Sequence, residues 1–184
     1  CAASLLGLEK WLDKKDDALI HEAVSKIIML HGIILSFGGI PMIYAGDEIG
    51  TLNDYSFLKD HSKREDSRWV NRPRQDWKMI PKIESKDLPQ SKIFLTLQKM
   101  IAIRKENPVF ADDNSLSLCH TGNDHILVFE RTDNLKNGVL VICNFDENTQ
   151  VVESSWILKL GYFTKGEPKD LVSGKKIFLK SGLL

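Results

Sequence analysis

Residues 38–54 read GGIPMIYAGDEIGTLND, a stretch that joins a helix stop, an apolar run and an acidic glycine turn. Gly38 and Gly39 predict the end of a helix, because glycine adopts the left-handed conformation of a helix C-cap at little cost. Residues 40–44 are apolar without alternation, which is typical of a strand covered on both faces in a parallel sheet. A buried strand that follows a helix is half of a βαβ unit, so the stretch predicts one step of an α/β barrel.

Two helices are predicted on either side of this strand. Apolar residues recur at steps of three and four over residues 17–37, which is the period of an amphipathic helix. The same period follows Ser91, which we expect to cap a second helix that ends at Asn107 and Pro108. Residues 45–90 carry little periodicity, and a long loop at the carboxyl end of a barrel strand is typical of a functional segment.

Beyond Phe110 the apolar period changes to two, which predicts a small antiparallel β-domain. Turn signals such as Asn137-Gly138 separate the predicted strands. These strands cover residues 116–120, 125–131, 138–145, 149–153, 170–172 and 176–179. The change of period divides the chain into a first domain, 1–109, and a second domain, 110–184.

The composition of the 184 residues is that of a globular protein, with 42% hydrophobic and 27% charged residues. Its 25 basic and 25 acidic side chains balance, so we expect no recruitment of nucleic acid or of an anionic membrane. No apolar run approaches the ~18 residues of a membrane span, and no leader is recognised. Cys1, Cys119 and Cys143 lack disulfide or zinc spacing, so we expect reduced thiols and a cytoplasmic protein.

Seven motifs are spread over nearly the whole chain: LLGL (5–8), GGIPMIYAGDEIG (38–50), TLND (51–54), DSRW (66–69), RPR (72–74), MIAIRKENP (100–108) and DLVSGKK (170–176). These motifs resemble the amylosucrases of the α-amylase superfamily, which contains glycoside hydrolases and transglucosidases. The glycine-rich run is shared widely in that superfamily, whereas GTLND followed by DSRW is much narrower.

This resemblance implies an α/β plus all-β fold. Residues 1–109 would be the last part of a (β/α)8 TIM barrel, and residues 110–184 an antiparallel C-terminal β-sandwich. The chain opens as if within a helix or loop, so we expect a fragment of a longer protein. The family usually continues into one more β-strand, so we expect the second domain to lack its last strand and to keep an open edge.

Amylosucrases transfer the glucosyl unit of sucrose to a glucan acceptor or to water by a retaining mechanism, with two catalytic carboxyl groups about 5 Å apart. In the family the Asp nucleophile and the Glu acid/base precede this segment, so we expect no catalytic residue here and an inactive fragment. The parent enzyme is expected to use sucrose and a glucan acceptor, and no cofactor. The alternatives are a sucrose hydrolase, a sucrose phosphorylase or an α-glucosidase of the same superfamily and, from another class, a non-catalytic carbohydrate-binding or interaction module.

Arg68 is the candidate substrate-binding residue. The resemblance places it on the arginine that pairs with an acidic residue from the first part of the barrel and closes the floor of the glucose pocket. Without that partner it would be a solvated loop arginine. Asp47 and Glu48 are neighbours along an extended backbone, so they point to opposite sides and cannot face one glycosidic bond together. We expect structural roles at the mouth of the barrel for Asp47, Glu48, Asn53, Asp54 and Asp66.

The remaining candidates are aromatic, histidine and mixed-charge residues. Trp69, Trp77 and Tyr55 could stack on sugar rings or anchor the loop against the barrel. No histidine has acidic or cysteine companions at metal spacing, so we expect no metal site. The two signs of charge in residues 59–74 indicate an internally paired loop instead of a nucleic-acid contact. Because the first domain lacks the neighbouring barrel elements, we expect it to self-associate through its exposed apolar surface.

Overall fold

The computed structural model describes residues 1–75, 77–83, 87–111, 115–133, 137–153, 155 and 168–177. The chain forms two compact units. Unit 1 comprises Cys1–Gly32 and Met42–Lys99, and unit 2 comprises Ile33–Pro41 and Met100–Leu184. The division predicted at residues 109 and 110 concerns the domains of a longer fold, and it stays a prediction.

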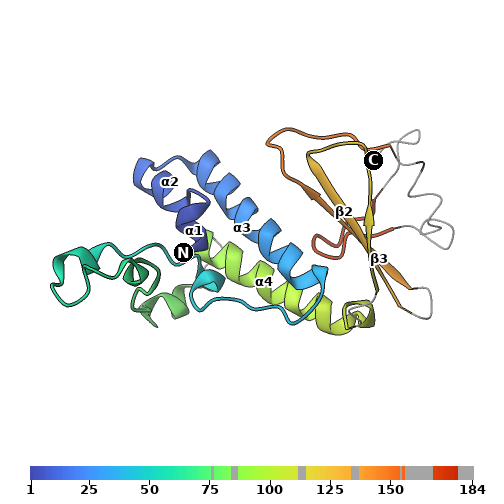
Figure 1. The fold of residues 1–184 in the computed structure, drawn as a ribbon. Coiled ribbons are helices and arrows are strands. Elements are labelled where there is room, and N and C mark those ends of the chain that lie inside the picture. The colour runs from blue at the N-terminus through green and yellow to red at the C-terminus, as the bar shows by residue number, and fades with distance from the viewer. Residues whose placement is uncertain are drawn as a thin grey trace. The chain divides into compact units, whose positions relative to one another are not determined.

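Unit 1 begins with two short helices, which the long helix α3 follows (Figure 1). The helix bounds are Ala2–Leu5 for α1, Leu8–Lys14 for α2, Asp17–Phe37 for α3 and Pro89–Glu106 for α4. Apolar side chains from all four helices form one core. The buried residues of this core are Ala3, Leu8, Ala23, Val24, Ile27, Ile93 and Leu97.

Helix α3 has a defined start and a defined stop. The carboxylate of Asp16 accepts a hydrogen bond from the backbone N–H of Leu19 (3.2 Å), as an N-cap residue does. Gly38 and Gly39 follow its last turn with φ angles of 144° and 64°, which side chains disfavour. The predicted bounds, 17–37, are confirmed, because the apolar period and the glycine stop agree.

Helix α4 starts two residues before the predicted cap. Pro89 is its first residue, a position where the missing N–H costs no helical hydrogen bond. Ser91 is therefore not the cap; it is fully buried, and its hydroxyl donates to the carbonyl oxygen of Lys82 (3.5 Å). The predicted end before Pro108 is confirmed, since α4 ends at Glu106.

Helix α3 is long and apolar enough to cross a membrane, judged by length and composition, with a mean hydropathy of 1.6. This corrects the expectation that no segment of the chain reaches that length. The core helix of a soluble protein passes the same test, and Ala23, Val24 and Ile27 of α3 are buried in the core of unit 1. The helix is therefore weak support for a membrane span.

Residues 40–44 do not form the predicted buried strand. Ile40 and Met42 are 92% and 82% exposed, so the run is not covered on both faces. A strand requires a hydrogen-bonded neighbour, and no described segment of this chain pairs with residues 40–44. The apolar composition of residues 40–44 indicates a segment that can be buried, but composition does not show whether a neighbouring strand is present. The loop that follows contains short 3₁₀ turns: η1 (Asp47–Ile49), η2 (Ser56–Lys59), η3 (Ser67–Asn71) and η4 (Trp77–Lys82).

Unit 2 contains an antiparallel sheet of three strands in the order β1-β2-β3, of which Figure 1 labels β2 and β3. Val128 and Phe129 on β2 are 1% and 0% exposed although neighbouring strand residues point to opposite faces, so β2 is covered on both faces. The bounds are Leu116–Cys119 for β1, Ile126–Thr132 for β2 and Gly138–Asn144 for β3, after a 3₁₀ turn η5 at Pro108–Phe110.

These three strands confirm the predictions for 116–120, 125–131 and 138–145 to within one residue at each end. The strand predicted at 170–172 is wrong, because residues 171–173 form a turn between the isolated bridge partners Lys169 and Lys176. Residues 149–153 belong to none of the three strands, and 178–179 of the last predicted strand lie outside the described residues. The β-sandwich and the TIM-barrel portion stay predictions.

Arg131, on β2, binds the C-terminal end of α3 within unit 2. Its side chain is 0% exposed, and its guanidinium donates to the carbonyl oxygens of Ser36 (3.1 Å) and Phe37 (2.8 Å). It also donates to the hydroxyl of Ser115 (2.9 Å) and to the carbonyl of Val109 (3.2 Å). The last carbonyls of a helix have no partner inside the helix, so this arginine both satisfies them and stabilises their partial negative charge.

Arg104, on α4, completes the same helix end. It donates to the carbonyl oxygens of Leu35 (2.6 Å) and Gly39 (3.0 Å). The ring of Phe37 meets that of Phe129 edge-on, with 5.3 Å between centroids. Strand β2, helix α4 and turn η5 thus converge on the last turn of α3.

We predict that Arg131→Met destabilises unit 2 by about 3 kcal/mol or more, because it leaves several buried carbonyl groups without donors. Denaturant unfolding, read with hydrogen exchange of the β2–β3 amides, measures the loss. Lys105→Met removes an exposed cation from the last turn of α4 and should change stability by less than about 0.5 kcal/mol. Equal stability of the two variants would contradict a dependence on Arg131.

Candidate functional site

Unit 1 contains an open pocket of about 680 Å³, called the unit 1 pocket below. One part of its lining comes from the first residues of the chain: Cys1, Ala2, Ser4, Leu5 and Glu9. The other part comes from the long loop: Tyr44, Asp47, Asn53, Tyr55, Arg68 and the pair Asn71 and Arg72. The pocket brings together Arg68, Asp47 and Asn53 of the predicted residues, whereas Glu48, Asp54 and Asp66 are not among its lining.

The glycine turn positions Asp47 and Glu48. Gly46 has φ of 104°, and its backbone N–H donates to Oε2 of Glu48 (2.7 Å). This contact engages Glu48 in the turn and leaves Asp47 as the acidic residue of the turn that lines the pocket. Gly50 closes the turn with φ of 61°, and a Cβ added there would lie 2.8 Å from Cδ1 of Ile93 in the core.

His31 is a buried residue of α3 that lies near Asp47. The imidazole is 4% exposed, and its Nδ1 lies 2.8 Å from the carbonyl oxygen of Ile27. Since a carbonyl can only accept, Nδ1 carries a proton. Nε2 is then directed at Asp47, with 4.0 Å to Oδ2. The absence of a metal role for histidine stays a prediction. No group of three or more potential metal ligands occurs in the described part of the chain.

Asn53 and Asp54 make hydrogen bonds that hold the part of the loop around residues 53–56. The backbone N–H of Asn53 donates to the hydroxyl of Ser4 (2.9 Å), and its Nδ2 donates to the hydroxyl of Tyr55 (3.1 Å). The carboxylate of Asp54 accepts from the backbone N–H of Ser56 (2.8 Å). Hydrogen bonds from the side chain and backbone of Ser56 lower the pKa of Asp54, so this carboxylate is ionised when it holds the turn.

Arg68 pairs with Asp66, two residues before it. Its Nε donates to Oδ1 and a terminal nitrogen donates to Oδ2, each at 2.8 Å, and its backbone N–H donates to Oδ1 (3.0 Å). The side-chain hydrogen bonds from Arg68 lower the pKa of Asp66, and those to Asp66 raise the pKa of Arg68. The side chain of Arg68 is 73% exposed at the pocket, so Arg68 has a local carboxylate partner, and its expected pairing with an acidic residue of the preceding barrel part stays a prediction.

Two of the aromatic candidates, Trp69 and Tyr55, have different surroundings in the structure. The ring of Trp69 faces two cations, Lys63 at 4.8 Å and Arg72 at 5.9 Å from its centroid, so it is occupied by cation–π contacts. Tyr55 is 52% exposed and lines the pocket, which leaves it accessible to a ligand. The side chain of Trp77 lies outside the described part of the structure.

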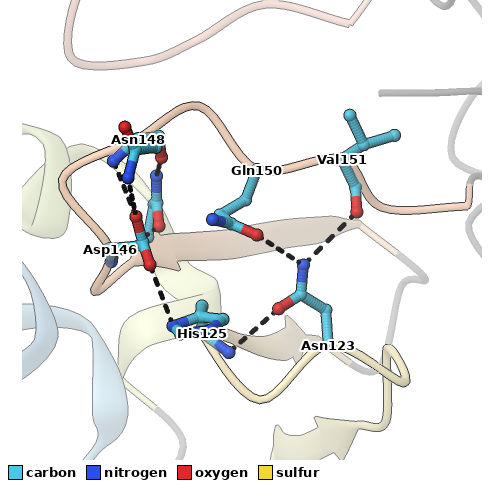
Figure 2. A network of polar contacts seen from close by, with 7 residues as sticks. Asn123, His125, Asp146, Asn148, Gln150 and Val151 are labelled. Atoms are coloured by element: carbon cyan, nitrogen blue, oxygen red, sulfur yellow. Dashed lines mark hydrogen bonds and ion pairs between the residues drawn. The ribbon is translucent and has the colours of Figure 1, made fainter.

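A second polar network connects two turns of unit 2 (Figure 2). His125 lies 3.1 Å from the carboxylate of Asp146, and Asn123 donates to the side chain of Gln150 (3.1 Å). Hydrogen bonds from the backbone and side chain of Asn148 lower the pKa of Asp146. The dashed contacts in Figure 2 join these polar side chains and backbone groups to one another, so the network supports a structural role for the two turns.

Sequence reasoning missed Arg72, Asn71 and Tyr44 as pocket residues. Arg72 was part of the RPR motif that supports the resemblance, but no role followed from the motif. A signal was available, since Arg68 and Asn71 both lie in η3 (Ser67–Asn71), Arg72 is its C-cap, and residues three apart in a 3₁₀ turn lie on the same side.

Comparisons with known proteins give a distant relative. No protein family model matches the chain. The chain is 26% identical over 133 residues to glucosylglycerate phosphorylase from Escherichia coli (strain K12), a match that covers 72% of this chain and 23% of that protein. The chain thus spans less than a quarter of the length of this relative. The match supports a distant relationship to the glycoside hydrolases and phosphorylases of the α-amylase superfamily, without singling out amylosucrase.

We predict that Gly50→Ala destabilises unit 1 by about 3 kcal/mol, the sum of a left-handed alanine and of crowding against Ile93. Gly39→Ala, in unit 2, is the control for the cost of the backbone conformation alone, because its φ of 64° is similar and an added Cβ meets no atom within 4 Å. It should cost about 1 kcal/mol, from the backbone alone. Thermal or urea unfolding compares the two variants, and equal losses would argue against the packing contact.

We also predict that Asp66 titrates below the usual range of an aspartate and that Arg68→Gln moves its pKa upward. A pKa lowered by folding adds stability above the unfolded pKa, and this contribution is lost as the pH falls through the folded pKa. NMR titration of the Asp66 carboxyl carbon measures both values. An unchanged pKa in the variant would show that the side chain of Arg68 does not hold this carboxylate.

Proposed function

We propose that this chain is part of a longer glucosyl-transferring enzyme of the α-amylase superfamily, and that the unit 1 pocket forms part of its sugar-binding site. Residues 1–109 would close a (β/α)8 barrel, and residues 110–184 would form a C-terminal β-domain. The single observation that carries the proposal is the gathering of Arg68, Asp47 and Asn53 at one pocket. The exposure of Ile40 and Met42 supports a barrel strand whose neighbours lie elsewhere in the longer protein.

The proposed role of this chain is binding, not bond cleavage. A retaining enzyme requires two carboxyl groups about 5 Å apart on either side of the glycosidic bond. Glu48 accepts the N–H of Gly46, and Asp47 faces His31 and the pocket, so these neighbours do not form such a pair. Carboxylate and amide groups of the kind present in Asp47 and Asn53 accept and donate hydrogen bonds to sugar hydroxyls.

The donor and acceptor are proposed as sucrose and a glucan chain or water, on the narrower resemblance of GTLND and DSRW to amylosucrases. Phosphorolysis is the second candidate, favoured by the name of the relative, glucosylglycerate phosphorylase. A non-catalytic carbohydrate-binding module is the alternative of another class, and the open, donor-rich pocket would suit it as well.

The test uses the full product of the gene and, separately, the 184-residue chain. With sucrose, we expect the full product to release fructose and the chain alone to release none; added phosphate would yield glucose 1-phosphate if the enzyme is a phosphorylase. Release of fructose by the chain alone would place catalytic groups within it. Sugar binding without turnover by the full product would favour the binding module.

In the full product, Arg68→Gln should lower kcat/KM by about 10- to 100-fold, because Arg68 lines the pocket. Arg64→Gln is the matched control; it removes an arginine of the same loop that pairs with Glu65 and does not line the pocket. It should leave kcat/KM within about twofold. Equal losses in the two variants would remove Arg68 from the sugar site.

A further inference from the structure

His31 is a buried titratable residue of α3 to which the proposed sugar site gives no role. Its Nε2 lies 4.0 Å from Oδ2 of Asp47, and the side chain of Asp47 is only 16% exposed. Asp47 lines the unit 1 pocket, whereas His31 is not among the lining residues. A group in this position acts on a ligand only through the carboxylate that it faces.

The carboxylate of Asp47 lacks a hydrogen-bond donor from the described part of the chain. The backbone around it is fixed, because the N–H of Asp47 donates to the carbonyl of Tyr44 (2.9 Å) and its carbonyl accepts from the N–H of Gly50 (3.1 Å). The N-terminal amine of Cys1, also at the pocket, donates to the side-chain oxygens of two asparagines, Asn53 and Asn71, and not to Asp47. A mostly buried carboxylate without a donor destabilises the folded state, so the imidazole is the group that matters for Asp47.

The orientation of the imidazole is set from its other nitrogen. Nδ1 of His31 donates to the carbonyl oxygen of Ile27 (2.8 Å), one turn earlier in α3, so Nε2 is the nitrogen that faces Asp47. An unprotonated Nε2 and an ionised carboxylate are both acceptors, and they would repel each other. A proton on either atom makes the contact attractive.

We propose that His31 is a positioning residue of the unit 1 pocket: a proton between its Nε2 and Oδ2 of Asp47 holds the carboxylate in one orientation. Oδ1 is then left to accept a hydrogen bond from a neutral hydroxyl group of the ligand. The inference deepens the proposed function, on which it rests, by naming the residue that orients a sugar-binding carboxylate.

The first measurement locates the proton in the 184-residue chain without a ligand. Nitrogen-15 NMR of the imidazole shows which ring nitrogens of His31 are protonated, and carbon-13 NMR of the Asp47 carboxyl carbon shows whether this group is ionised. We expect a proton on Nε2 or on the Asp47 carboxyl group. An unprotonated Nε2 beside an ionised Asp47 would overturn the proposal, and this measurement requires no variant.

Two substitutions separate the two contacts of His31. Asparagine places its amide nitrogen near the position of Nδ1 and keeps a donor for Ile27, whereas glutamine places its amide nitrogen near Nε2 and keeps a donor for Asp47. We expect NMR scalar couplings to show one χ1 rotamer of Asp47 in the unaltered chain and in His31→Gln, and several rotamers in His31→Asn. His21→Asn is the matched control, because His21 is an exposed histidine of α3 that contacts Lys92; it should leave the Asp47 rotamer unchanged.

The second measurement is the kinetics of the full product of the gene with sucrose. His31→Asn should lower kcat/KM by about 10-fold, and His31→Gln by less than about threefold, because glutamine restores the donor. In an Asp47→Asn background, His31→Asn should have no further effect, since His31 acts through Asp47. His21→Asn should leave kcat/KM within about twofold.

Equal losses in His31→Asn and His31→Gln, or an undiminished loss in the Asp47→Asn background, would make His31 a core residue without a positioning role. The proton and the rotamer are measured without turnover, so the two proposals fail separately. A protonated contact and a single Asp47 rotamer without glucosyl transfer by the full product reject the proposed function alone. Glucosyl transfer with an Asp47 side chain that samples several rotamers rejects the positioning role alone.

Discussion

The end of helix α3 is the constraint on which unit 2 depends. A helix leaves its last carbonyl groups without internal partners, and at Leu35 to Gly39 two guanidinium groups supply the missing donors. Arg131 arrives from the central strand and Arg104 from helix α4, so sheet and helix are fixed at one point. Removing either arginine would leave polar groups without donors, a cost that apolar packing nearby does not offset.

The parts of the fold that could be predicted are those with a strong local period. Helix α3 and the three strands follow from apolar spacing, and their ends follow from glycine and turn residues. Residues 40–44 show the limit, because strand formation needs a neighbour and composition does not say whether one is present. The burial of Arg131 shows a second limit of prediction from sequence. An arginine on a strand reads as an exposed position, and only the tertiary fold reveals that it reaches a helix end.

The candidate site was predictable in part. The DSRW motif directed attention to Arg68 and Asp66 through resemblance, but the expected partner lay in another part of the barrel. The structure shows a local pair between Arg68 and Asp66, the N-cap of η3, and the expected pairing stays a prediction. The pocket position of Arg72 could not be predicted from composition, since it depends on the fold of the η3 turn that Arg72 follows. Charge pairing is a property of geometry and not of sequence order.

The contact between Ser36 and Arg131 joins residues 95 positions apart. During synthesis, at about 5–20 residues per second, Ser36 is added to the chain roughly 5 to 20 seconds before Arg131. All buried residues of the unit 1 core precede Arg131 in the chain, so the helix can have its core while the carbonyls of Ser36 and Phe37 still lack the Arg131 donor. The order of synthesis therefore places the completion of the α3 end after every buried residue of the unit 1 core has been made.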